Sequence, residues 1–169
     1  HYAFNLGCDG AEDVVNIYNK DPNADFHDIV SKIANISRTN AKTINLGLLY
    51  GMGVKKLAEE LKFDKDLVKD FLAKFHKQIP FIKDLSNRVS QYANSTGYVA
   101  TLKGRKCRFE LWEPTSFGVF KALPYDQAKE KYGRHHALQR AGTYKALNRL
   151  IQGSAADQTK KAMVDLYNE

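Results

Sequence analysis

The chain has 169 residues, of which 43% are hydrophobic and 27% are charged. This length and composition are typical of a soluble globular domain with its own core and exclude a large multidomain enzyme. The net charge of +7 favours a polyanionic partner, with nucleic acid as the first candidate. A basic surface without such a partner remains the alternative.

The use of cysteine in this chain favours a reducing compartment. Cys8 and Cys107 have neither metal-ligand nor redox spacing, so we expect a reducing environment and no disulfide scaffold. No apolar run approaches the roughly 20 residues of a membrane span, and no signal peptide is visible. The chain begins with His1 rather than Met, so we expect it to be cut from a longer protein.

The first half of the chain is predicted to be helical after an irregular lead-in over residues 1–23. Asp25 is a candidate N-cap for the helix that follows it, and Ser37 for the next, which we expect to end at Gly51 or Gly53. Apolar residues at helical spacing predict further helices over residues 54–63, 64–79 and 80–96, with Asp64 as the candidate N-cap of the second.

The second half changes in texture. Residues 98–112 have the β-type composition of a hairpin, with a turn at Lys103 and Gly104. Residues 114–136 contain prolines, glycines and mixed charge and are predicted to be a loop or a poorly ordered insertion, and residues 137–169 are predicted to return to one long helix. The expected fold is mainly α with a small β-hairpin, in the α+β class.

The stretch "SRTNAKTINLGLLYGMG", residues 37–53, repeats chemically distinct side chains every four residues. Arg38, Lys42, Leu46 and Tyr50 share one broad face of a helix. Two cations one turn apart repel each other unless an anion lies between them, and a triphosphate is such an anion. Leu46 and Tyr50 would then face sugar and base. The same spacing is common on amphipathic helices with a solvated basic end, so it leaves both interpretations open.

Three other stretches stand in a fixed order around this helix: "ADFHDIVS" before it, and "GYVATLKGRKCRF" and "NRLIQGSAAD" after it. The helix itself carries the pattern R-x3-K-x7-YG. Together they resemble the motifs of family A, the DNA polymerase I-like DNA polymerases, over about residues 20 to 168. "TYKALNRLIQGSAAD" is more similar to the bacteriophage-type branch than to the cellular repair enzymes.

The resemblance implies a role for each matching residue. His27, Arg38 and Lys42 would hold the triphosphate of the incoming nucleotide. Arg38 and Lys42 would be the catalytic side chains, with Lys42 as the general acid that protonates the leaving pyrophosphate. Leu46 would lie at the sugar, and the helix would close over a correct base pair before chemistry. The implied DNA contacts are Tyr50, Gly51, Arg105, Asn148 and Gln152.

Two residues depart from the family pattern. Leu46 stands where the family usually has Phe or Tyr, so discrimination against sugar analogues does not follow from the resemblance. Tyr144 stands where the cellular enzymes tend to carry an arginine. One DNA contact is therefore expected to be altered or absent.

The resemblance also implies two Mg²⁺ ions, held in this family by aspartates of a "DYSQIELR"-like and an "HDE"-like segment. Neither segment is in this sequence, and we expect them just before His1 and just after Glu169. No metal ligand is therefore expected in the chain, and the isolated fragment is expected to be inactive. The implied parts are a palm lead-in, helical fingers, a hairpin with a loop, and a palm helix, over residues 1–24, 25–97, 98–138 and 139–169.

The implied whole protein is a template-directed DNA polymerase that transfers deoxynucleotides to a DNA primer. Its expected partners are primer–template DNA and deoxynucleoside triphosphates. We expect a monomer without membrane contact, in the cytoplasm of a bacterium or of a phage-infected host. Two alternatives stay open: a non-catalytic basic helical module that binds nucleic acid, and a structural domain whose polymerase-like helix has lost its role.

Other polar and aromatic residues receive structural interpretations. Asp157 and Asp165 need a partner segment to bind a metal ion, so we expect solvated or structural roles for them. His135 and His136 lack ligands at zinc spacing and are assigned to the loop. Trp112 is expected to pack against the hairpin.

Overall fold

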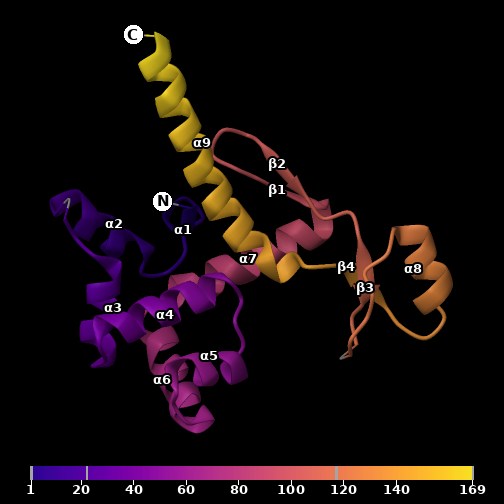
Figure 1. The fold of residues 1–169 in the computed structure, drawn as a ribbon, viewed down its shortest axis with the longest axis horizontal. Helices are drawn as coiled ribbons and strands as arrows, with labels where there is room; N and C mark the ends of the chain where they lie inside the picture. The colour runs from indigo at the N-terminus through magenta and orange to yellow at the C-terminus, as the bar shows by residue number, and fades with distance from the viewer. Residues whose placement is uncertain (1, 22, 117, 169) are drawn as a thin grey trace. The chain divides into compact units, whose positions relative to one another are not determined.

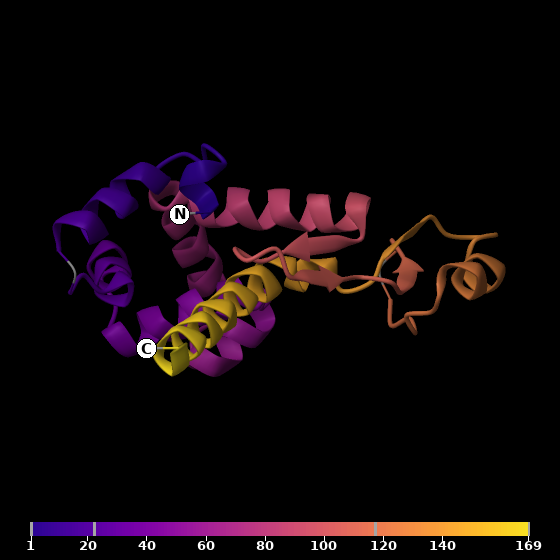
Figure 2. The ribbon, with the colours of Figure 1, turned by 90° about the horizontal axis from the view of Figure 1, so that it is seen from above.

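The computed structural model describes residues 2–21, 23–116 and 118–168, without the side chains of residues 33 and 34. The chain forms two compact units, residues 1–87 and 88–169 (Figures 1 and 2). The first unit contains the helices α1 (Tyr2–Asn5), α2 (Ala11–Lys20), α3 (Phe26–Ala34), α4 (Arg38–Leu49), α5 (Val54–Leu61), α6 (Lys65–Gln78) and the start of α7 (Pro80–Thr96). The second contains the end of α7, then β1 (Tyr98–Ala100), β2 (Lys106–Arg108), β3 (Trp112–Pro114), α8 (Tyr125–Tyr132), β4 (Leu138–Arg140), the 3₁₀ helix η1 (Thr143–Lys145) and α9 (Ala146–Asn168).

Helices α3 to α7 form where the sequence predicts them. The side chains of Asp25, Ser37 and Asp64 each accept a hydrogen bond from a backbone N–H of the following helix, at 2.7, 3.2 and 2.8 Å, which confirms the predicted N-caps. Gly51 lies just after the end of α4 with φ of 69°, a left-handed conformation that favours glycine. Gly51 therefore ends α4, whereas Gly53 is the N-cap of α5.

The irregular lead-in predicted for residues 1–23 is wrong, because α1 and α2 lie there. Glu12 and Asp13 in the first turn of α2 and Lys20 in its last turn complement the helix dipole. The apolar side chains Ile17 and Tyr18 are 39% and 41% exposed, so α2 is an amphipathic helix whose apolar face is only partly covered. Residue 22, in the loop that follows, lies outside the described residues.

Two clusters of buried apolar side chains hold the first unit together. The first joins α3, α4, α6 and α7 through Val30, Ala41, Phe75, Ile79 and Ile82. The second joins α4, α5 and α6 through Ile44, Leu57, Ala58, Leu61 and Val68. Helix α4 contributes to both clusters, so one face of it is fixed against the core and the other is left outside.

In the second unit, β1 and β2 form the predicted antiparallel hairpin, with Val99 opposite Cys107. The prediction that its second strand runs to Trp112 is wrong. Trp112 belongs to β3, which pairs with β4 and places Trp112 opposite Arg140. The Arg140 guanidinium lies 4.7 Å from the Trp112 ring, and the Tyr125 ring lies 4.9 Å from it, edge to face. Trp112 thus packs on Arg140 and Tyr125 instead of on the hairpin.

The loop predicted for residues 114–136 is also wrong in part, because it contains α8, which packs on β3 and β4 (Figure 1). This helix is polar and buries only Ala128, so it shows no apolar stripe in the sequence. Residue 117 lies outside the described residues. The long helix begins later than predicted, at Ala146, since β4 and η1 come first and Gly142 takes a φ of 71° between them.

The predicted class, mainly α with a small antiparallel β component, is confirmed. The β component consists of two strand pairs, β1–β2 and β3–β4, where the sequence predicted one hairpin. Across the described residues, no helix combines the length and the apolar character needed to cross a membrane.

Candidate functional site

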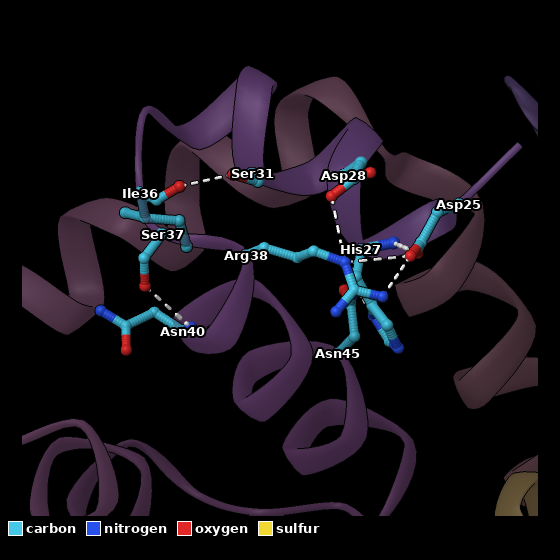
Figure 3. A network of polar contacts seen from close by, with 9 residues as sticks. All are labelled: Asp25, His27, Asp28, Ser31, Ile36, Ser37, Arg38, Asn40 and Asn45. Atoms are coloured by element: carbon cyan, nitrogen blue, oxygen red, sulfur yellow. Dashed lines mark hydrogen bonds and ion pairs between the residues drawn. The ribbon is translucent and has the colours of Figure 1, made fainter.

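The first candidate site lies where α3 and α4 begin, and one carboxylate organises it (Figure 3). Asp25 caps α3 by accepting the backbone N–H of His27 at 2.7 Å through Oδ1. Its other oxygen, Oδ2, accepts from Nε of Arg38 at 3.0 Å and also from the terminal nitrogen NH2. Asp28 adds an ion pair with Arg38 at 3.1 Å. The structure thus ties two of the predicted nucleotide-binding residues, His27 and Arg38, to the same side chain.

Hydrogen bonds explain the direction in which the pKa values of Asp25 and Arg38 shift. The hydrogen bond from Arg38 is the largest cause that lowers the pKa of Asp25, followed by the bond from the His27 backbone N–H. The same hydrogen bond raises the pKa of Arg38. The side chain of Arg38 remains 56% exposed, and the NH1 atom of its guanidinium makes no contact with the two carboxylates.

The ring of His27 is held from the opposite helix. Nδ2 of Asn45, on α4, lies 2.9 Å from Nδ1 of His27. Asn45 is only 3% exposed, and its Oδ1 atom has no hydrogen-bond partner among the described residues. His27 is therefore held by two contacts, one at its backbone N–H and one at its ring.

The remaining predicted residues of this region lie along the outer face of α4 and at its end. Lys42 is exposed one turn after Arg38, Leu46 is 39% exposed and Tyr50 is 48% exposed. Tyr50 is the C-cap of α4, and the exposed Gly51 follows it. The core side of the same helix carries Ala41, Ile44 and Asn45, all buried. The predicted common face of Arg38, Lys42, Leu46 and Tyr50 is thus accessible to a ligand.

The second candidate site joins the β1–β2 loop to α9. Arg105 donates from Nε to Asp157 at 2.8 Å and from NH2 to the carbonyl of Gly153 at 2.9 Å. Thr101 donates to the other oxygen of Asp157, and the backbone N–H of Leu102 donates to Ser154 at 3.1 Å. The Arg105 side chain is 51% exposed while Asp157 is 8% exposed, so the charge pair lies at the edge of the core.

Of the two roles expected for Asp157, solvated or structural, the structure shows the structural one. The hydrogen bond from Thr101 is the largest cause that lowers the pKa of Asp157, and the bond from Arg105 is the second. Gln152 and the half-buried Asn148 lie one turn apart on α9, next to this network. A Cβ on Gly153 would lie 2.8 Å from Thr101 Cγ2, so glycine is needed for the hairpin to approach α9 this closely.

The sequence matches the family model of DNA polymerase family A over residues 12–169. This chain belongs to DNA polymerase family A.

Relatives within family A come from phages and from bacteria. The chain is 35% identical over 181 residues to a DNA-directed DNA polymerase of Pseudomonas phage M6, which covers 87% of this chain and 24% of the phage protein. It is 33% identical to DNA polymerase I of Helicobacter pylori, covering 78% of this chain and 13% of that enzyme. The chain thus spans a quarter or less of these relatives.

A solved structure has a similar fold. It is the POL domain of Pol1 from M. smegmatis in complex with DNA primer-template and dNTP. The TM-score is 0.65 at 26% sequence identity, and the match covers 87% of this chain and 24% of that one.

Sequence reasoning missed the residues that hold the nucleotide-binding candidates in place. Asp25 was found as an N-cap, but no signal linked it to Arg38, 13 residues away. Nor did any signal link Asn45 to His27, since the i to i+4 pattern draws attention to the outer face of α4 and Asn45 lies on the other face. Both partners become visible only when α3 and α4 pack together.

The chain does not fit the family metal site by itself. In the part of the chain that the structure describes, no three His, Cys, Asp or Glu side chains gather as a group that could hold a metal ion. Asp157 is committed to Thr101 and Arg105, and Asp165 pairs with Lys161.

Proposed function

We propose that this chain is the part of a template-directed DNA polymerase that holds the incoming deoxynucleoside triphosphate and contacts the primer–template. The reaction is deoxynucleotidyl transfer to a DNA primer. The observation that carries the proposal is the convergence of His27 and Arg38 on Asp25, with Lys42 one turn further along the exposed face of α4. Membership of family A and a structural relative described in complex with DNA primer-template and dNTP support it.

In this proposal the side chains of His27, Arg38 and Lys42 bind the triphosphate. Asp25 and Asp28 hold Arg38 by Nε and NH2, which leaves the NH1 side of the guanidinium to donate to phosphate oxygens. Lys42 is exposed and has no hydrogen-bond or ion-pair partner among the described residues, so its ammonium is available to a second anionic oxygen. As the pyrophosphate leaves and gains negative charge, Lys42 donates a proton to it.

The outer end of α4 serves the sugar and the template. Leu46 packs against the sugar, and Tyr50 stacks at the templating base, where an aromatic face accepts any base. Gly51, Arg105, Asn148 and Gln152 contact the DNA. Because Arg105 is anchored to α9 by Asp157 and still half exposed, it can present its remaining N–H groups to a phosphate without losing its position.

Family A polymerases depend on metal ions, and we propose that two Mg²⁺ ions serve this enzyme too. Their ligands lie in other segments of the longer polymerase, since the described residues offer no group for them. In that polymerase, residues 25–97 would form the fingers, residues 139–169 a palm helix, and residues 1–24 and 98–138 the lead-in and the hairpin with its loop. It would act as a monomer in the cytoplasm of a bacterium or phage-infected cell.

The test uses a longer polymerase that contains this chain, and it separates chemistry from binding. Lys42→Ala should lower the single-turnover rate of incorporation by about 10² to 10⁴, the range for loss of a positioned general acid, while DNA affinity stays within about threefold because Lys42 contacts the nucleotide. Lys56→Ala, an exposed lysine on α5, is the matched control and should leave both unchanged.

The outcome also separates the polymerase from a binding module. Equal losses of rate and DNA affinity in Lys42→Ala would refute its chemical role. A loss of DNA affinity in Arg38→Ala and Lys42→Ala with no change in nucleotide affinity would favour a nucleic-acid-binding module instead.

A further inference from the structure

The amide of Asn45 occupies a place where an apolar side chain would be expected. Asn45 is 3% exposed on the core face of α4, beside Ala41 and Ile44, which are 0% and 1% exposed. Its Oδ1 atom is buried and has no partner among the described residues. A buried amide with an unsatisfied oxygen is costly, so the contact that its nitrogen makes needs an explanation.

We propose that Asn45 is a positioning residue that fixes the proton of His27 on Nε2 and aims that N–H at the triphosphate. This inference rests on the proposed function of His27. Nδ2 of Asn45 carries only donor hydrogens, and it lies 2.9 Å from Nδ1 of His27. With the amide in this orientation Nδ1 accepts, which in a neutral imidazole places the ring proton on Nε2.

The surroundings make this control effective. The backbone of His27 is fixed because its N–H donates to Asp25 at 2.7 Å, and the same carboxylate holds Arg38. Asn45 on α4 contacts the ring of His27 on α3, and Figure 3 draws this pair together with Asp25 and Arg38. The backbone N–H and Nδ1 are thus both held, and Nε2 has no partner among the described residues. A donor that is already oriented loses little freedom when an anion binds.

The alternative is that Asn45 merely ties α3 to α4. Both roles predict that Asn45→Leu changes stability, so stability cannot separate them. Only the positioning role predicts a change in the protonation pattern of the ring, and only it predicts that the effect on phosphate binding disappears when His27 is absent.

The experiment uses the 169-residue chain labelled with ¹⁵N at histidine, at about pH 8, where a free imidazole is neutral. Ring ¹⁵N shifts distinguish the protonated from the unprotonated nitrogen. His27→Ala identifies the signals of His27 among those of the five histidines. Wild-type His27 should carry its proton on Nε2. Asn45→Leu should give a mixture of the two neutral forms, and Asn45→Asp, which offers only acceptors, should move the proton to Nδ1. Asn40→Leu, on the same helix, should leave the wild-type pattern.

Binding of inorganic tripolyphosphate, measured by calorimetry, is the second readout. Asn45→Leu should weaken binding about tenfold, the low end of the effect of removing a residue that orients a ligating histidine, and should have no effect in the His27→Ala background. A His27 proton on Nδ1 in the wild type, or a ring pattern unchanged in both Asn45 variants, would overturn the inference. Because the wild-type ring is itself measured, a variant that fails to fold does not remove the test.

Failure of the proposed function would look different. If the ring pattern behaves as expected but the wild-type chain binds no tripolyphosphate, the role of His27 in triphosphate binding is refuted. The purpose assigned to Asn45 is then refuted with it.

Discussion

Ile44 and Leu46 lie two residues apart on α4 and have opposite surroundings. Ile44 is 1% exposed and belongs to a buried cluster with Leu57, whereas Leu46 is 39% exposed. Two residues along a helix correspond to about 200° of rotation, which places the side chains on opposite sides. Truncation of each to alanine therefore tests which face of α4 is turned to the core and which is left for a nucleotide.

The expected magnitudes follow from burial. Ile44→Ala removes three buried carbon atoms, worth about 0.8 kcal/mol each, and leaves a cavity that adds roughly 1 kcal/mol. We therefore expect the free energy of unfolding to fall by about 3 kcal/mol. Leu46→Ala removes the same number of carbons from a side chain already partly in water and leaves no closed cavity, so we expect about 1 kcal/mol.

The assay is urea unfolding of the 169-residue chain, followed by far-ultraviolet circular dichroism. With a slope of about 2 kcal/mol per molar urea, the midpoint should fall by about 1.5 M for Ile44→Ala and by about 0.5 M for Leu46→Ala. Equal shifts, or a larger shift for Leu46→Ala, would refute the assignment of faces on α4. The proposed contact between Leu46 and the sugar would be lost with it.

Two other predictions concern selectivity and acid stability. In the longer polymerase, Leu46→Phe should lower the use of ribonucleotides relative to deoxynucleotides by about tenfold, because the larger ring fills space beside the sugar. Competitive primer extension measures this ratio. An unchanged ratio would show that residue 46 does not face the sugar. The lowered pKa of Asp157 means that its ionised form stabilises the fold above the ordinary range of an aspartate, and that this stabilisation is lost as the pH falls through the lower folded value. Thr101→Val removes the largest cause of the lowered pKa. The melting temperature of this variant should therefore fall less between about pH 5 and pH 2 than that of the wild type. The fluorescence of Trp112, the one tryptophan in the sequence, reports the melting, and identical pH profiles would contradict the role of Thr101.

Sequence reasoning succeeded where local chemistry decides the structure. Asp25, Ser37 and Asp64 precede apolar residues at helical spacing, and each caps the helix predicted from it. A cap and an amphipathic stripe are properties of neighbouring residues, so no knowledge of the tertiary structure is needed to find them. The mainly helical class follows from the same signals.

Sequence reasoning failed where contacts between residues far apart in the sequence decide the structure. Trp112 has the composition of a hairpin strand, but its strand pairs with residues 138–140, which carry little strand signal of their own. Helix α8 buries a single alanine and is supported by β3 and β4, so its sequence has no stripe to find. In the candidate site, Arg38 and His27 were found by resemblance, whereas the contact of Asn45 with His27 depends on how α3 and α4 pack.

The close approach at Gly153 has a consequence for how the second unit can vary. The hairpin touches α9 where a methyl group would not fit, and Arg105 bonds to the carbonyl of the same glycine. The loop and the helix therefore cannot drift apart or slide without losing the Arg105 and Thr101 contacts with Asp157 together. Arg105 and Gly153, 48 positions apart in the sequence, are thus held together by one network of hydrogen bonds. An insertion in the turn between β1 and β2 would therefore move Arg105 away from Asp157 and Gly153 on α9, even though it leaves every residue of that helix unchanged.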